Sequence, residues 1–143
     1  HDEASAFFGG LAGNAGLFST ARDVARVYQM LLNGGEIDGQ RYLSKETCQL
    51  FTTETSKISR RGLGFDKPDA DDPKKGNCAP AAPAEVYGHT GFTGTCAWVD
   101  PMNELVYVFL SNRIYPDVTN RKLNQLHIRE RIQGAIYDAM KKK

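Results

Sequence analysis

Three consecutive segments rich in β-branched and aromatic residues restrict the fold more than any other feature: 85–91, 94–100 and 104–112. Only short turns separate them, and connections of that length join antiparallel neighbours. The sequence therefore predicts a three-stranded antiparallel meander. The third segment contains an unbroken apolar run, Leu105 to Leu110, so we expect this strand to lie centrally with both faces covered.

The C-terminal residues supply a helix to cover the sheet. From about Thr119 to Lys142 the pattern predicts one helix, with Arg121, Arg129, Glu130 and Arg131 mostly off its apolar stripe, which consists of Ile128, Ile132, Ala135, Ile136, Ala139 and Met140. A helix with one apolar stripe packs that stripe against a sheet. We expect it to lie across the meander.

The first part of the chain reads as mainly helical. Thr20 has the character of an N-cap, and apolar residues at helical spacing follow it as far as Leu32, before Asn33-Gly34-Gly35. Asp38-Gly39 predicts a hairpin turn between two short extended pieces. Ser44 then caps a second helix that runs to about Thr53.

A proline-rich and charged segment links the two halves. Four of the six prolines lie between Lys67 and Ala84, which predicts a surface loop. We therefore expect one α+β unit over residues 1–143, with a mainly helical portion at 1–60, a loop at 61–84, and the sheet and C-terminal helix at 85–143.

Composition excludes several classes of function. The net charge is +1 and the basic residues are scattered, so we expect no nucleic-acid partner. The three cysteines form no Cys-x-x-Cys pair and the three histidines lie far apart, so we expect no metal site. The chain has no apolar run that could span a bilayer and begins at His1, from which we expect a fragment of a longer protein.

One glycine-rich octet has the pattern of a functional site. Residues 88–95 run through the end of one strand, a tight turn and the start of the next. Their glycines let a ligand approach the backbone, and N–H groups near Phe92 are candidate oxyanion donors. The alternatives are a plain glycine-rich β-turn and, for His89 taken alone, a solvent-facing strand histidine.

His89-Thr90-Gly91, with Trp98-Val99-Asp100-Pro101 and Leu110-Ser111-Asn112-Arg113 after it, resembles the C-terminal region of the serine β-lactamase and penicillin-binding-protein family. The likeness is to its class C, DD-peptidase and esterase branch. Two upstream segments resemble the same family in the same order: Gly16 to Arg26 with Leu31 to Gly35, and Gly62 to Asp66. The resemblance implies part of a β-lactamase/transpeptidase-like fold.

The resemblance also implies roles for four residues. His89 takes the place of the cation in the family's Lys-Thr-Gly motif, supplying a donor and an optional positive charge. Thr90 hydrogen-bonds the substrate, and the N–H of Phe92 is one of two oxyanion donors. Gly91 keeps the strand edge open to the acyl group. His1-Asp2-Glu3 is a further candidate for ordering the site, and Asn14 stands where relatives often have His.

The family's nucleophile motif is missing from the chain. No serine has Lys three positions on, and no tyrosine has Asn two positions on. Because both motifs precede the matched segment in the family, we expect a C-terminal fragment, inactive alone. It should lack the N-terminal part of its own domain, expose a strand edge and tend to self-associate.

The resulting expectation is part of a serine hydrolase that forms an acyl-enzyme with a β-lactam, a peptidoglycan peptide or an ester. It would need no cofactor and, by family analogy, would be periplasmic or secreted. The alternatives are a non-catalytic binding or packing module of the same fold, appended for example to a glycoside hydrolase such as a β-N-acetylglucosaminidase, and a stand-alone α+β domain with no site.

Overall fold

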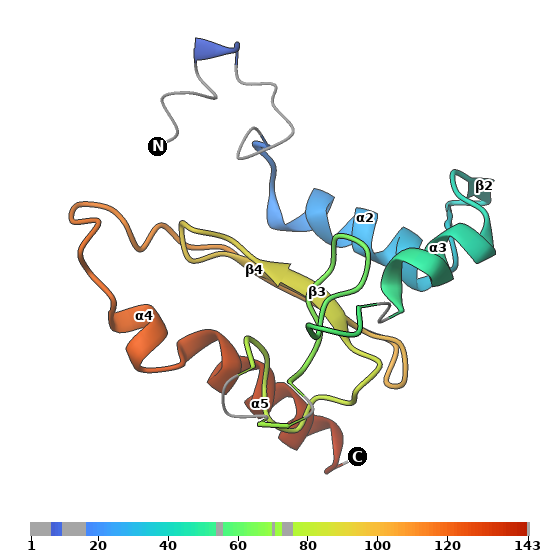
Figure 1. The fold of residues 1–143 in the computed structure, drawn as a ribbon. Helices are drawn as coiled ribbons and strands as arrows, with labels where there is room; N and C mark the ends of the chain where they lie inside the picture. The colour runs from blue at the N-terminus through green and yellow to red at the C-terminus, as the bar shows by residue number, and fades with distance from the viewer. Residues whose placement is uncertain (1–6, 10–16, 54–55, 70, 73–75, 143) are drawn as a thin grey trace.

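The computed structural model describes residues 7–9, 17–53, 56–69, 71–72 and 76–142. As predicted, it is an α+β structure built on a three-stranded antiparallel sheet in the order β3-β4-β5. The strands are β3 (Tyr87–Thr90), β4 (Cys96–Asp100) and β5 (Leu105–Phe109). Helix α2 (Ala21–Leu32) packs against β4 and β5 on one side, and α5 (Ile128–Met140) lies on the other (Figure 1).

The central strand is β4, so the prediction that the third strand lies centrally was wrong. All five residues of β4 are buried, whereas Tyr107 is the only fully buried residue of β5. An apolar run indicates that both faces of a strand are covered. It does not indicate how many strands pair with that strand. In the described part of the chain, no strand pairs with the outer edge of β5.

The predicted caps and turns of the first half are confirmed. Oγ1 of Thr20 accepts a hydrogen bond from the Asp23 N–H (3.2 Å), and Oγ of Ser44 accepts one from the Thr47 N–H (3.1 Å). The second of these caps begins α3 (Lys45–Thr52). A tight Asp38-Gly39 turn, with positive φ at both residues, joins the short strands β1 (Glu36–Ile37) and β2 (Gln40–Arg41).

The predicted C-terminal helix is broken into two. A short α4 (Lys122–Gln125) precedes α5, and between them His127 adopts a left-handed conformation with φ of 49°. The prediction of one helix from about Thr119 was therefore wrong at this position. A residue with positive φ cannot continue a right-handed helix, and hydropathy alone does not show such a break.

The face of α5 that packs on the sheet also differs from the predicted stripe. Ile136 packs against the core, but Ile132 is 38% exposed, while Arg129 and Glu130 are buried. Two of the buried polar side chains have strong partners: Gln133 accepts a hydrogen bond from the Ala79 N–H (2.7 Å), and the Tyr137 hydroxyl donates to Asp100 (2.8 Å). Oε2 of Glu130 is buried without a hydrogen-bond partner among the described residues. Satisfied polar groups can be buried at little cost, so hydropathy misassigned this face.

The described residues of the segment 61–84 form no helix, and the segment does not lie wholly at the surface as we expected. Cys78 belongs to the buried core together with Val86, Cys96, Trp98 and Tyr107. Lys67 is also buried, and its Nζ donates to the carbonyl oxygens of Thr52 and Glu85, both at 3.1 Å. The loop thus fills the space between the sheet and α5. None of the helices in the described ranges is long and apolar enough to span a membrane.

Gly88 should be intolerant of any side chain. A Cβ at this position would lie 2.1 Å from the Ala97 carbonyl oxygen and 2.6 Å from the Trp98 ring. Gly88→Ala should therefore lower the free energy of unfolding by about 2 kcal/mol or more. Gly134→Ala is the matched control, because its Cβ would meet only Ala79 at 4.0 Å and should stabilise α5 by up to about 1 kcal/mol. Equal effects in urea titrations would contradict this packing.

The core thiols should make stability fall in alkali. Burial raises the pKa of Cys78 to about 12 and that of Cys96 to about 11, from an ordinary value of 9.0. The folded state keeps both thiols protonated, so their contribution is fully present below about pH 9 and is lost as the pH rises towards 12. Urea unfolding followed by Trp98 fluorescence should show a loss of about 2 kcal/mol or more between pH 8 and 10.5.

The control for the alkaline loss is the Cys78→Ala/Cys96→Ala double variant. It removes both thiols and should lose distinctly less stability over the same pH interval. Burial also raises the pKa values of Tyr87, Tyr107 and Tyr137, so part of the alkaline loss should remain. An unchanged loss in the double variant would show that the thiols do not cause it.

Candidate functional site

The predicted motif lies where β3 ends and the turn to β4 begins. His89 and Thr90 are the last two residues of β3, and both are half-buried. The turn is closed by a hydrogen bond from the Gly94 N–H to the Gly91 carbonyl (3.0 Å). Gly94 has a φ of 98°, and a Cβ there would lie 2.5 Å from Oγ of Ser111. Both the conformation and the space therefore require glycine.

Phe92 lies at the tip of this turn. Its side chain is 61% exposed, and the Arg113 guanidinium lies 4.8 Å from the centroid of its ring. The Arg113 N–H donates to the Thr93 carbonyl (2.9 Å), which ties the chain after β5 to the same turn. A cation over the face of an aromatic ring is attracted to it. The turn that carries Phe92 is thus held by a second segment.

One edge of β3 is paired with β4, and the other is only partly covered. Asp66 forms an isolated antiparallel bridge to Gly88, with backbone hydrogen bonds of 2.7 and 3.1 Å. Successive residues of a strand direct their backbone groups to opposite edges, so the backbone of Thr90 faces the same edge as that of Gly88. The His89-Thr90-Gly91 motif therefore begins directly after the part of the β3 edge that pairs with Asp66.

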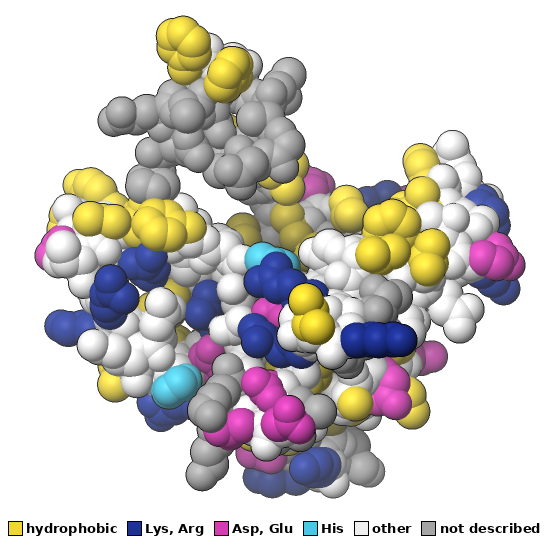
Figure 2. All heavy atoms as spheres, viewed as in Figure 1, with side chains coloured by type: hydrophobic (Ala, Val, Ile, Leu, Met, Phe, Trp, Pro, Cys, Tyr) yellow, Lys and Arg dark blue, Asp and Glu magenta, His cyan; other side chains and the backbone are white. Residues whose placement is uncertain are grey.

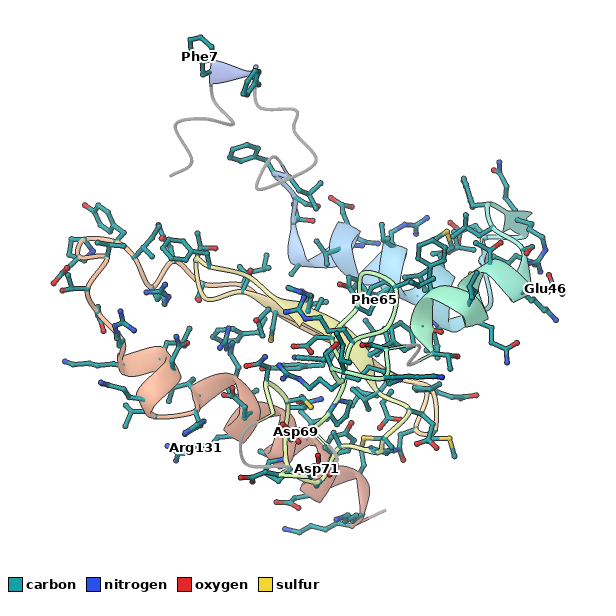
Figure 3. All side chains as sticks on the ribbon, in the orientation of Figure 1. Phe7, Glu46, Phe65, Asp69, Asp71 and Arg131 are labelled. Carbon is teal, nitrogen blue, oxygen red and sulfur yellow. The ribbon has the colours of Figure 1, made fainter. Side chains whose placement is uncertain are left out.

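Asp66 is anchored by side chains as well as by its backbone. Its carboxylate is 1% exposed, forms an ion pair with Arg60 (2.9 Å), and accepts a hydrogen bond from Nδ2 of Asn77 (2.9 Å). Its neighbour Phe65 packs edge-on against Tyr28 and Tyr87, with ring centroids 6.2 and 5.3 Å apart. Figure 3 shows Phe65 beside the sheet, close to α2 and α3. This segment is therefore fixed relative to β3.

Both ring nitrogens of His89 are engaged. Nδ1 lies 2.7 Å from the Thr90 carbonyl oxygen, and Nε2 lies 3.2 Å from Nη1 of Arg61. A carbonyl only accepts and a guanidinium only donates, so the proton must be on Nδ1 and the Nε2 lone pair must face Arg61. The donor role predicted for His89 stays a prediction.

A cavity of about 600 Å³ opens beside the motif. Thr90, Gly91 and Phe92 line one side of it, and Arg129 and Glu130 of α5 contribute to the other. The Nη1 of Arg129 donates to the Thr95 carbonyl (3.3 Å), which joins α5 to the motif hairpin. Figure 2 shows that both described histidines lie close to basic side chains on this face. The cavity is large enough for a small organic ligand.

The described residues contain no cluster of three His, Cys, Asp or Glu side chains that could hold a metal ion. Burial raises the pKa of Cys78 and of Cys96, so neither thiol is activated as a nucleophile. The groups that the motif places beside the cavity are therefore a hydroxyl and backbone amides rather than a metal site or an activated thiol.

The four predicted site residues, His89 to Phe92, lie together because they are consecutive in the chain. Thr93 and Gly94 complete the turn that holds them. His1-Asp2-Glu3 and Asn14 lie outside the described residues. Arg61 and Asp66 also lie at this edge, which no pattern in the sequence predicted. The sequence shows the Arg60-Arg61 pair just before the glycine-rich segment 62–66. Nothing in its spacing predicts a contact with His89.

Comparisons with known proteins agree with this arrangement. The model of the β-lactamase family matches residues 1–130. A protein of Escherichia coli O157:H7 named "Putative D-alanyl-D-alanine carboxypeptidase" is 37% identical over 126 residues, which are 87% of this chain and 29% of that protein. Proteins with the same name from Escherichia coli strain K12 and Salmonella agona strain SL483 are 36% and 35% identical, with the same coverage.

The chain thus spans 29% of the length of these relatives. The family match extends over most of the chain, from its first residue to within α5. It includes the hairpin that carries His89-Thr90-Gly91 and the segment that pairs with it. The chain therefore belongs to the β-lactamase family, that of the serine β-lactamases and penicillin-binding proteins.

Proposed function

We propose that this chain forms one wall of the active site of a serine hydrolase that cleaves the terminal peptide bond of peptidoglycan stem peptides through an acyl-enzyme. The observation that carries the proposal is the position of the motif, at the uncovered part of the β3 edge and beside a cavity of about 600 Å³. The name of the relatives favours a carboxypeptidase. β-Lactams and small esters are further acyl donors for the same chemistry.

Three motif residues have distinct roles in this proposal. The Thr90 hydroxyl hydrogen-bonds the bound acyl donor from the strand edge. The Phe92 N–H points to the oxygen that becomes negative in the tetrahedral intermediate and shares it with a second N–H at the nucleophile. Gly91 lets the acyl group approach the backbone. It is also required by packing, because a Cβ there would lie 2.2 Å from Oγ1 of Thr95.

The nucleophile is proposed to come from another part of the same protein. The chain contains no Ser-x-x-Lys, and it spans 29% of the length of its relatives. The outer edge of β5 and the exposed Ile132 on α5 are suited to bind a strand and a helix from that part. Where this surface is uncovered, self-association of the chain is the expected consequence.

The proposed reaction implies where the enzyme would act and whether it would need a cofactor. Peptidoglycan lies outside the cytoplasm, so the enzyme would act in the periplasm or after secretion. A serine activated by lysine performs acyl transfer without a metal or an organic cofactor. The partner of the site is therefore a small molecule or a peptidoglycan-derived peptide, and no nucleic acid is involved.

The proposal can be tested by covalent labelling. A protein that carries this chain together with Ser-x-x-Lys should be acylated by a fluorescent penicillin, and Ser→Ala in that motif should abolish the label. Thr90→Val removes one hydrogen-bond donor and keeps the shape, so it should slow acylation about 10-fold or more. The 143-residue chain alone should hydrolyse neither nitrocefin nor p-nitrophenyl acetate, since it has no nucleophile.

Two results would count against this function. Hydrolysis by the chain alone that is abolished by His89→Ala would show that the chain has its own nucleophile. Absence of any label on the longer protein, with its fold intact by circular dichroism, would favour a non-catalytic module of the same fold.

A further inference from the structure

Two carbonyl groups fix the direction of the Phe92 N–H. The Gly91 carbonyl accepts a hydrogen bond from the Gly94 N–H (3.0 Å) inside the turn. Because the peptide unit between Gly91 and Phe92 is planar and trans, the Phe92 N–H points the opposite way, out of the turn. The Thr95 carbonyl accepts from the Gly91 N–H (2.8 Å) and also from Nη1 of Arg129 (3.3 Å). The Arg129 side chain therefore takes part in the hydrogen bonding that orients this peptide unit.

Arg129 is itself held in place at the start of α5. It is buried, and its Nη2 donates to Oδ1 of Asn124 on α4 (3.1 Å). Its carbonyl accepts from the hydroxyl of Tyr107 on β5 (3.1 Å). The left-handed His127 separates α4 from α5, so one guanidinium joins two helices to the motif hairpin. A planar guanidinium that donates to two fixed acceptors has a defined position.

The hydrogen bonding of the buried Arg129 side chain is incomplete. Its Nε has no hydrogen-bond partner among the described residues, and its Nη2 lies 4.0 Å from Oε1 of Glu130, whose Oε2 also lacks one. Burying a charged pair with missing hydrogen bonds costs free energy, and apolar side chains of similar volume are often at least as stabilising. Packing alone therefore does not favour an arginine here. What the arginine adds is a fixed donor to the Thr95 carbonyl, from a residue that lines the same cavity as Phe92.

We infer that Arg129 is a positioning residue for the oxyanion donor: through the Thr95 carbonyl it holds the Gly91-Phe92 peptide unit in the direction that the tetrahedral intermediate requires. This inference rests on the proposed function. A donor that is oriented before the reaction stabilises the charge that develops in the transition state, and it does so without reorganisation. Because this charge is absent from the bound substrate, the role of Arg129 appears in the rate of acylation and not in the affinity for the acyl donor.

The test is single-turnover acylation by nitrocefin of the longer protein that carries Ser-x-x-Lys. Arg129→Met removes the donor to the Thr95 carbonyl and leaves an apolar side chain in its place. It should lower the limiting rate of acylation about 10- to 100-fold and change the apparent dissociation constant of nitrocefin less than about 3-fold. Phenylboronic acid, which forms a tetrahedral adduct with a nucleophilic serine, should bind the variant more weakly by about the same factor as the loss in rate.

Two further variants separate this role from a general effect of charge or folding. Arg131→Met removes an exposed cation from the same helix (Figure 3) and should leave the rate and the boronic acid affinity unchanged. Arg129→Met/Glu130→Gln also removes the carboxylate that the single variant leaves buried without its cation. It should be more stable than the single variant and acylate as slowly. All rates are taken per folded site, counted by complete labelling with fluorescent penicillin, and Trp98 fluorescence checks the core.

The outcomes distinguish the inference from the proposed function. If both Arg129 variants keep the wild-type rate per folded site, or lose only affinity for nitrocefin, the inference is wrong and the proposed function stands. The same holds if fewer folded sites account for the whole loss, because Arg129 then has a structural role alone. If the wild type is acylated by neither nitrocefin nor fluorescent penicillin, the proposed function fails and the inference fails with it.

Discussion

The pairing of Asp66 with Gly88 is the interaction on which the rest of the site depends. It places a second segment along the outer edge of β3, and among the described residues no further backbone pairing covers that edge from Thr90 onwards. The buried Asp66 carboxylate is bound by Arg60 and Asn77, and Gly88 has no room for a side chain beside Ala97 and Trp98 of β4. An unpaired charge at this depth would be strongly destabilising. The same few contacts thus stabilise the fold and determine which part of the strand a ligand can reach.

The surroundings of His89 give the motif a different electrostatic character from a Lys-Thr-Gly motif. A lysine there would present its own charge at the strand edge, whereas here the imidazole of His89 lies in contact with the guanidinium of Arg61. The charge is then carried by a planar group with several donors on a separate segment. Arginine recognises a carboxylate with defined geometry, while lysine acts more as a point charge. A guanidinium thus lies beside the motif histidine, 3.2 Å from its Nε2.

Local patterns in the sequence predicted most of the elements. The caps at Thr20 and Ser44, the turn at Asp38-Gly39 and the three-stranded meander depend on neighbouring residues, and all were found where expected. Strand order and the buried face of α5 depend on distant contacts. The apolar run of β5 gave no information about its neighbours, and the hydrogen bonds that allow Gln133 and Tyr137 to be buried come from Ala79 and Asp100. For the same reason the motif was visible in the sequence, but the contact between Arg61 and His89 was not.

The most direct test of the account is a crystal structure of the longer protein acylated by benzylpenicillin. We expect the acyl carbonyl oxygen to lie about 2.7–3.1 Å from the Phe92 nitrogen, with the acyl group along the β3 edge beside Thr90. An acyl group bound away from the β3 edge would contradict this assignment.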